Sequence, residues 1–553
     1  MFVRGKKSGK RVYLQVVENR RQNGRVRQKV IGTLGRLDRL HASGALDSLI
    51  ASCTKFSEKL SVLGAHERGE LTELRSGRIG PGLVFGRLWE ELGIRECLKE
   101  TLADRRFRFS VERAIFLTVV HRLMLPGSDR AADRWRENYV LPDTEDIDLH
   151  HLYRAMAWLG EVLPKNEQEG NTKHSPRCVK DVIEERLFAR QRDLFSDLAI
   201  LFFDTTSLYF HGEGGETLGR RGKSKDFRGH LKQMVVGLVL NEAGRPICCE
   251  IWPGNTADVS TVVPLLQRLQ KRFHVTRVCL VGDRGMVSKG IIDYLEAHEF
   301  SYVLGAKMRN QKEVKEEVLA RAGRYRVVRP GRNRAKDPSP LKVKEVWVED
   351  RRYIVCLNEE QARRDAAERE AILTQLREKL RSGSKSLVKN KGFRRYLKTT
   401  ESAFEVDENR VKAEARLDGK WVLTTNTDMD AAAVALTYKD LWMVEAIFRS
   451  VKSVLETRPV FHKTDETIRG HVFCSFLALL LMRELQYRMW DHGWGEAEWE
   501  HLLRDLAELT ETEVRASDGK CFRLRVNLSG WCGKVFQAVG VALPHTVRPA
   551  GEH

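Results

Sequence analysis

The order of β-rich and helical runs between residues 195 and 308 constrains the fold of this chain more than any other sequence feature. Five runs of apolar and β-branched residues occur there, beginning with LAILFFDTTSLYF. Two helical segments separate the last three β-rich runs. The first of these helical segments extends from about Asp258 to Phe273. The order β-β-β-α-β-α-β predicts an α/β chain with a mixed sheet, in which the first and fourth strands are neighbours.

Acidic residues stand at the ends of these two neighbouring strands. Asp204 belongs to the first strand, and Asp283 ends the fourth in VTRVCLVGDRG. A single acid at a strand end is commonly a helix cap or half of a surface salt bridge. Two carboxylates on adjacent strands, however, repel each other unless a cation lies between them. The strand order with these acids is that of an RNase H-like fold, and the pair predicts a Mg²⁺ site, with Mn²⁺ as an alternative metal.

A third acid, Glu445, lies on a helix predicted to run from AAAVALTYKD to VKSVL. Tyr438 precedes it by seven residues and Lys452 follows it by seven, so at 100° per residue all three fall on one stripe, with Arg449 beside it. A solvated polar face is the ordinary explanation for such a stripe. A carboxylate there would instead complete a two-metal site with the two strand aspartates.

Further regions flank and interrupt this core. A charged stretch too long and too patterned for a loop predicts a mostly β insertion. Asn23-Gly24 between two β-rich runs predicts an N-terminal β-hairpin, and Ser128 is a predicted helix cap. The predicted regions are a basic hairpin region (1–65), a helical module for DNA binding or dimerisation (66–194), the first part of the core (195–308), the insertion (309–420), the second part with the acidic helix (421–490) and a C-terminal region (491–553).

The charge balance bears on the partner of the chain. There are 95 Lys and Arg residues against 76 Asp and Glu residues, a net charge of +19. This excess favours a polyanionic partner, most simply nucleic acid, although an ordinary basic surface also explains it. The ten cysteines form no C-x-x-C pair, which favours reduced thiols in a cytosolic protein over zinc.

Apolar segments and the N-terminus bear on membranes and secretion. The longest apolar run, from Val472 to Met482, is too short to span a membrane and predicts a buried helix. The first residues lack the apolar region of a secretory signal.

At several motifs the chain resembles the insertion-sequence transposases of the DDE class, and specifically the insertion-sequence-four superfamily, whose signature is Y-x2-R-x3-E-x6-K. Tyr438, Glu445 and Lys452 match the signature, but Leu441 occupies the arginine position. The likeness extends over FDTTS, VGDRG, DGKWVLTTN and RPVFHKTDETIRGHVF, roughly residues 195–490, and VIGTLGRL is similar to one subgroup.

The resemblance implies a site. It implies that Asp204, Asp283 and Glu445 bind the metal, and that Tyr438 and Lys452 contact a phosphate of the DNA end. Arg449 is a possible replacement for the missing arginine. In relatives an aromatic residue of the insertion holds a flipped base; Trp347 is the candidate here, with a core position as the alternative.

Basic residues near the predicted site would suit the DNA backbone. They lie in the glycine-spaced run between the first two strands, beside the second aspartate and in the insertion, where aromatic residues interleave with them. These residues are Lys225, Arg228, Arg284 and the stretch 385–395 with Phe393 and Tyr396.

The expected function is that of a transposase that cleaves the ends of its element and joins the 3′ ends to target DNA. The resemblance implies double-stranded DNA as partner, a homodimer in the synaptic complex, and a cytoplasmic, nucleoid-associated bacterial protein without a membrane anchor. Two alternatives are a structure-specific nuclease on the same fold and a catalytically silent DNA-binding relative. Acids at all three metal-ligand positions disfavour the silent relative.

Overall fold

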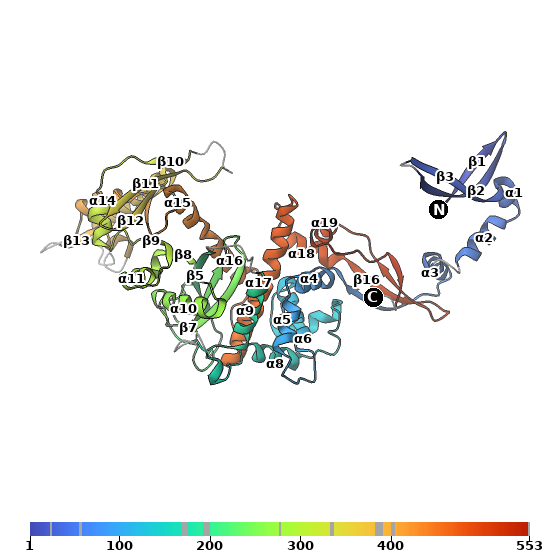
Figure 1. Cartoon of the computed structure of the whole chain (residues 1–553), viewed down its shortest axis with the longest axis horizontal. Helices are drawn as coiled ribbons and strands as arrows, with labels where there is room; N and C mark the ends of the chain where they lie inside the picture. Colours follow the sequence, from blue (N-terminus) through green and yellow to red (C-terminus); the bar gives the residue numbers. More distant parts are fainter. Residues whose placement is uncertain are drawn as a thin grey trace. The chain divides into compact units, whose positions relative to one another are not determined.

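The computed structural model describes residues 1–22, 25–54, 58–168, 175–191, 199–275, 278–331, 337–381, 391–399 and 404–550. The chain divides into two compact units (Figure 1). One unit contains residues 1–84, 137–141 and 492–553, and the other contains residues 85–136 and 142–491.

The first unit begins with an antiparallel three-stranded sheet in the order β1-β2-β3. The predicted hairpin corresponds to β2 and β3, which pair up to Gln22 and Arg25, while Asn23 and Gly24 lie outside the described residues. Strand β1 was not predicted. The elements of this region are β1 (Phe2–Ser8), β2 (Arg11–Gln22), β3 (Arg25–Arg36), α1 (Leu37–Ala42), α2 (Ala45–Thr54) and α3 (Glu58–Glu67).

A second sheet in the first unit joins residues from both ends of the chain. The region after residue 66 was expected to be helical, but Thr72–Arg78 forms β4 and pairs with β16 near the C-terminus. Val62, Val514 and Phe522 form a small core beside this sheet. The elements are β4 (Thr72–Arg78), α18 (Trp499–Glu508), β16 (Thr510–Arg515), β17 (Cys521–Arg525), α19 (Cys532–Val539) and β18 (Val547–Pro549).

The expected helical module is present, and most of it belongs to the second unit. As predicted, Ser128 caps a helix, because its Oγ accepts a hydrogen bond from the Ala131 N–H at 3.2 Å. The predicted buried apolar run lies within α17. The helices are α4 (Gly80–Glu91), which spans the unit boundary, α5 (Ile94–Thr101), α6 (Val111–Met124), α7 (Asp129–Trp135), α8 (Leu149–Leu159), α9 (Val179–Gln191) and α17 (Asp465–Asp491).

Helices α8 and α17 pack closely at two glycines. A Cβ added at Gly470 would lie 1.9 Å from the Met156 carbonyl oxygen, and one at Gly160 would lie 2.0 Å from the Glu466 carbonyl oxygen. Larger residues would therefore force the helices apart. Within the described residues, none of the helices has the length and apolar character needed to cross a membrane.

A nine-stranded mixed sheet forms the centre of the second unit, in the order β10-β11-β12-β15-β9-β8-β5-β6-β7. Strands β5, β8 and β9 run parallel, which confirms that the first and fourth predicted core strands are neighbours. The strands are β5 (Ala199–Tyr209), β6 (Gln233–Leu240), β7 (Pro246–Pro253), β8 (Val278–Gly282), β9 (Ser301–Gly305), β10 (Arg326–Arg329), β11 (Leu341–Val348), β12 (Arg351–Leu357) and β15 (Lys420–Thr425).

Two helices and two short 3₁₀ turns connect the core strands. The helix expected from Asp258 divides into the turn η3 (Asp258–Ser260) and α10 (Val262–Phe273). After β8, the turn η4 (Arg284–Met286) leads into α11 (Lys289–Ala297). Apolar residues of these helices and of β5, β8 and β9 form one buried core.

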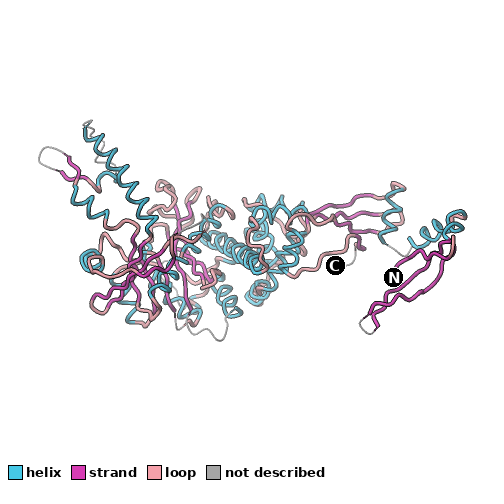
Figure 2. Tube along the Cα trace, turned by 90° about the horizontal axis from the view of Figure 1, so that it is seen from above, coloured by secondary structure: helices cyan, strands magenta, loops and turns pink. Residues whose placement is uncertain are grey.

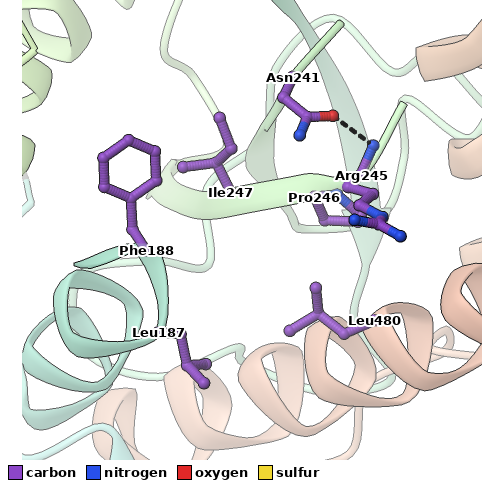
Figure 3. A pocket seen from close by; sticks show the side chains of 7 residues that line it. All are labelled: Leu187, Phe188, Asn241, Arg245, Pro246, Ile247 and Leu480. Atoms are coloured by element: carbon purple, nitrogen blue, oxygen red, sulfur yellow. Dashed lines mark hydrogen bonds between the residues drawn. The ribbon is translucent and has the colours of Figure 1, made fainter. Parts of the chain in front are cut away.

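Helix α9 packs on β7 through buried ion pairs. Arg272 of α10 contacts the carboxylates of Glu184 and Glu250 at 3.2 Å each, and all three side chains are almost fully buried. Because each charge has an oppositely charged partner, the ion pairs offset the cost of removing these groups from water. Nearby, the β6–β7 turn leaves a cavity of about 50 Å³ beside α9 and α17 (Figure 3), where the Arg245 N–H donates to Asn241 Oδ1 at 2.9 Å.

The insertion between β9 and β15 extends the core sheet, because β12 pairs with β15. Its long helix α12 projects away from the strands (Figure 2). Phe393 and Tyr396, expected to interleave with DNA-binding cations, are instead buried in a small core with Leu373 and Leu376, and residues 385–390 lie outside the described residues. The other elements are η5 (Val314–Val318), α12 (Glu359–Arg381), α13 (Lys391–Arg394), β13 (Leu397–Thr399), β14 (Phe404–Val406) and α14 (Glu408–Ala415).

The single helix expected around Glu445 is two helices, α15 (Ala431–Asp440) and α16 (Trp442–Ser453). Leu441 lies at the junction. The Leu441 N–H donates to the Tyr438 carbonyl at 3.2 Å, and the Val444 N–H donates to the Leu441 carbonyl at 3.0 Å. These three-residue spacings form a tighter 3₁₀ turn, which interrupts the α-helical rotation. The prediction of one continuous helix from Tyr438 to Lys452 was therefore wrong.

Candidate active site

Asp204 lies within β5, which continues to Tyr209, and not at the end of its strand as predicted. Asp283 directly follows β8, the parallel neighbour of β5. Phe203 pairs with Gly282, and each aspartate is the next residue in its strand direction. The side chain of Asp204 is only 20% exposed. Its burial raises its pKa to about 6, and the carboxylates of Asp283 and Asp258 add to the rise while Lys225 opposes it. The position therefore concentrates negative charge away from solvent.

Asp258, which the sequence reading placed only at the start of a helix, belongs to the same cluster. Strand β7 is antiparallel to β6, and β6 is antiparallel to β5, so β5, β7 and β8 all end at the same edge. Asp258 follows β7 at that edge. A Cβ added at Gly285 would lie 3.8 Å from both Asp258 Oδ2 and Asp283 Oδ2. Strand direction was the signal that could have identified this acid.

Lys225 carries its ammonium group into this cluster of acids. Its Nζ donates to the Thr205 carbonyl oxygen at 2.5 Å and to Thr205 Oγ1 at 2.8 Å. The same Nζ lies 3.4 Å from Asp258 Oδ2 and 3.8 Å from Asp204 Oδ1. Thr205 Oγ1 in turn donates to Asp258 Oδ1 at 2.6 Å. The cation thus partly neutralises both carboxylates.

Tyr438 contacts one of the acids. Its hydroxyl donates to Asp283 Oδ1 at 3.2 Å. Burial, and secondly the nearby Asp283, raises the pKa of Tyr438, so the phenol keeps its proton and acts as a donor. The hydroxyl lies only 2.6 Å from where a Cβ on Gly305 would be, so glycine in β9 makes room for it. Tyr438 therefore holds the Asp283 carboxylate in place.

Lys452 is engaged at the other end of α16. Its Nζ donates to Asp226 Oδ1 at 2.8 Å, and Arg458 lies 2.5 Å from Asp226 Oδ2. Burial lowers the pKa of Lys452, and the Asp226 carboxylate opposes this effect. Asp226 is the neighbour of Lys225 in the chain. One loop therefore contacts both the acidic cluster and the helix of Glu445.

Glu445 lies in the first turn of α16 and is exposed. Helix α16 packs on β6 and on β5, the strand that contains Asp204. Among the residues that the structure describes, the carboxylate oxygens of Asp204, Asp283 and Glu445 do not all come within 4.8 Å of one another. The role of Glu445 as third ligand stays a prediction.

The other predicted DNA contacts occupy different positions. Arg284 follows Asp283 and is exposed, as is Arg449 on α16. The guanidinium of Arg228 lies 4.8 Å from the centre of the Tyr209 ring. Trp347 is 52% exposed on β11, four strands from β8, which is about 19 Å at ordinary strand spacing. The structure brings Lys225 and Arg284 to the acids but not Trp347.

Comparison with known families identifies the chain. A family model described as the transposase DDE domain matches residues 196–481, just over half of the chain. The chain belongs to the DDE transposase family. A second model, the N-terminal domain of IS1634 family transposases, matches residues 3–66, and no curated protein matches the chain.

The acidic cluster lies within the part of the chain that matches the DDE domain. Asp204, Asp258, Asp283 and Glu445 all lie inside residues 196–481. The chain is therefore a transposase, an enzyme that acts on DNA. The three-stranded sheet and α1 to α3 correspond to the separately matched N-terminal domain of an insertion-sequence transposase.

Proposed function

We propose that this transposase cleaves DNA at the ends of its insertion sequence and joins the 3′ ends to target DNA, with Asp204, Asp283 and Glu445 as metal ligands. The observation that carries the proposal is the juxtaposition of Asp204, within β5, and Asp283, which directly follows the parallel strand β8. The raised pKa of Asp204 supports it, because a buried carboxylate beside other acids gains stability from a cation.

The donor groups fit Mg²⁺ or Mn²⁺. They are carboxylate oxygens, the ligands that hard divalent cations prefer, and no thiol or imidazole is among the proposed ligands. Two such ions, when bound, would activate the attacking oxygen and stabilise the leaving oxygen of a phosphodiester.

The surrounding side chains have separate roles in the proposal. Tyr438 orients Asp283 through its hydrogen bond. Lys225 donates to Thr205 and lies beside Asp204, from which its ammonium group can turn toward a non-bridging oxygen of the scissile phosphate. Arg284, exposed next to Asp283, supplies a second cation for the DNA backbone. These cations bring the DNA phosphate to a site whose acids alone would repel it.

The proposed partners are the two transposon ends and the target duplex. Two ends must be cut and joined together, so we propose that two protomers act in one synaptic complex. Mixing active protein with an Asp204→Asn variant tests this. A shared complex predicts that paired-end products fall with the square of the active fraction, whereas independent protomers predict a linear fall.

The central test is an assay on a duplex carrying the element end, with a plasmid as acceptor and Mg²⁺ present. Asp204→Asn, Asp283→Asn and Glu445→Gln should each reduce cleavage and joining by roughly a thousandfold or more, as should EDTA. Asp146→Asn, at an exposed position outside the site, is the matched control.

Other outcomes of this assay would favour a different function or a different set of metal ligands. Cleavage without joining would favour a structure-specific nuclease, and wild-type binding without cleavage would favour a silent relative. A covalent protein–DNA adduct trapped during the reaction would contradict direct transfer. Full activity of Glu445→Gln would remove Glu445 from the ligand set.

A further inference from the structure

A strongly basic cavity lies in the insertion, outside the proposed catalytic site. Its volume is about 320 Å³, and it lies where η5, α14 and the start of β15 meet. Its floor is apolar and includes Met308, Leu319 and Leu417. Within the part of the insertion that the structure describes, six cationic side chains line it, namely Arg309, Lys315, Arg395, Arg410, Arg416 and Lys420.

The cations of this cavity outnumber the acids within it. Of the described residues that line the cavity, Glu414 is the one acid, and it is shared by two arginines, with Arg309 Nε at 2.9 Å and Arg395 at 3.7 Å. Arg410 pairs with Asp407 at 3.1 Å. The positive charge that Glu414 leaves uncompensated is therefore several units.

Two of the cations are available for a ligand. Lys315 and Arg416 are exposed, and neither side chain makes an ion pair or hydrogen bond within the described part of the chain. The cations of the cavity also affect the pKa of a neighbouring residue. Burial lowers the pKa of Lys344, and the Lys420 ammonium group lowers it further. An anion in the cavity would relieve this repulsion.

We propose that this cavity binds a phosphorylated nucleotide, either as a unit of an unpaired DNA strand or as a free nucleotide. Arginine forks and lysine ammonium groups suit phosphate oxygens, and the apolar floor suits the base. The volume lies in the range of small-ligand sites. The site is separate from the cluster of Asp204, Asp258 and Asp283, and it needs no metal.

Calorimetric titration of the full chain in EDTA tests this site, since cleavage plays no part there. The probes are a 5′-phosphorylated thymidine tetranucleotide and ATP. Lys315→Gln with Arg416→Gln should weaken binding of at least one probe about tenfold, and for the tetranucleotide the log–log salt slope should fall by about 1.4. The matched control is Arg363→Gln with Arg364→Gln, which removes two exposed charges from α12 of the same insertion.

The two probes distinguish the sources of the nucleotide. Weakening of the tetranucleotide alone assigns the cavity to a DNA strand, and weakening of ATP binding assigns it to free nucleotides as well. Equal weakening by both double variants, or by neither, overturns the proposal. Thermal unfolding of each variant confirms that it is folded. Because the catalytic acids are unchanged in these variants, the proposed cleavage reaction can fail or succeed independently of this result.

Discussion

Asp204 holds a carboxylate in a largely buried position, and the charged form of this group lowers the stability of the folded chain. Its folded-state pKa of about 6 exceeds the ordinary value of 3.8, so the ionised form is less favourable in the folded chain than in the unfolded one. The penalty is absent below the unfolded pKa, grows as the pH rises from about 4, and is complete above the folded pKa.

Asp204→Asn should therefore make the protein more stable while abolishing cleavage. At pH 7.5 we expect the free energy of unfolding to rise by about 1–3 kcal/mol, with the gain disappearing near pH 4. Urea unfolding at the two pH values measures it. Asp146→Asn should show no such pH-dependent gain, and a loss of stability in Asp204→Asn at pH 7.5 would contradict the argument.

Asp258 has two possible roles that one variant separates. Asp258→Asn should reduce cleavage about 10- to 100-fold, because Asp258 holds Thr205 and faces the ammonium group of Lys225. If Asp258 only positions these groups, the Mg²⁺ concentration for half-maximal activity should stay within about twofold of wild type. A large increase in that concentration would make Asp258 a metal ligand. Wild-type activity would exclude both roles.

For single residues, the sequence predicted Asp204 and Asp283 because one lies within a recognisable strand and the other directly follows one. It could not reveal Asp258 or the position of Lys225, since both depend on where a loop returns in space. Tyr438 was selected by its spacing from Glu445. The contact it makes is nevertheless with Asp283, which is 155 residues away in the chain.

Among the elements, the junction between α15 and α16 explains the departure from the family signature. Leu441 stands where the signature has arginine, and it is 6% exposed at the 3₁₀ turn. An apolar side chain packs there without needing a partner, whereas a guanidinium would be buried. A periodic sequence pattern does not reveal such a turn, because the segment contains no glycine or proline that would mark a break in the helix.

Leu441→Arg, which restores the signature, should therefore destabilise this chain by about 3 kcal/mol or more, since it buries a charge without a designed partner. Leu441→Met, which conserves volume, should cost less than about 1.5 kcal/mol. Chemical denaturation of both variants compares them. Equal stability of Leu441→Arg and wild type would show that the junction already accommodates an arginine.

For the whole molecule, local patterns predicted the elements better than their long-range pairing. The core order from β5 to β9 followed from runs of residues near one another in sequence. The pairing of β4 with β16 joins segments more than 400 residues apart, so Thr72–Arg78 gave no local sign of its partner. Likewise, the insertion was recognised as an interruption, but not as an extension of the same sheet.

The net charge of +19 belongs to the molecule as a whole and predicts steep salt dependence. Affinity for a duplex without the element end should fall by at least about a hundredfold between 50 and 200 mM salt, because binding to phosphates releases counterions. Fluorescence anisotropy across this range, with EDTA present, gives the slope. A nearly flat dependence would indicate that the basic residues are compensated within the fold.

The placement of the insertion has a consequence for how the protein is made. Strand β9 ends at Gly305 and its neighbour β15 begins at Lys420, so the 114 residues from 306 to 419 must be translated before that edge is paired. At ordinary elongation rates this takes about 6–23 s. During that interval the growing polypeptide carries an open strand edge, which favours association with other chains. It also lacks Glu445, so a product of interrupted translation would carry the sheet without the complete set of proposed ligands.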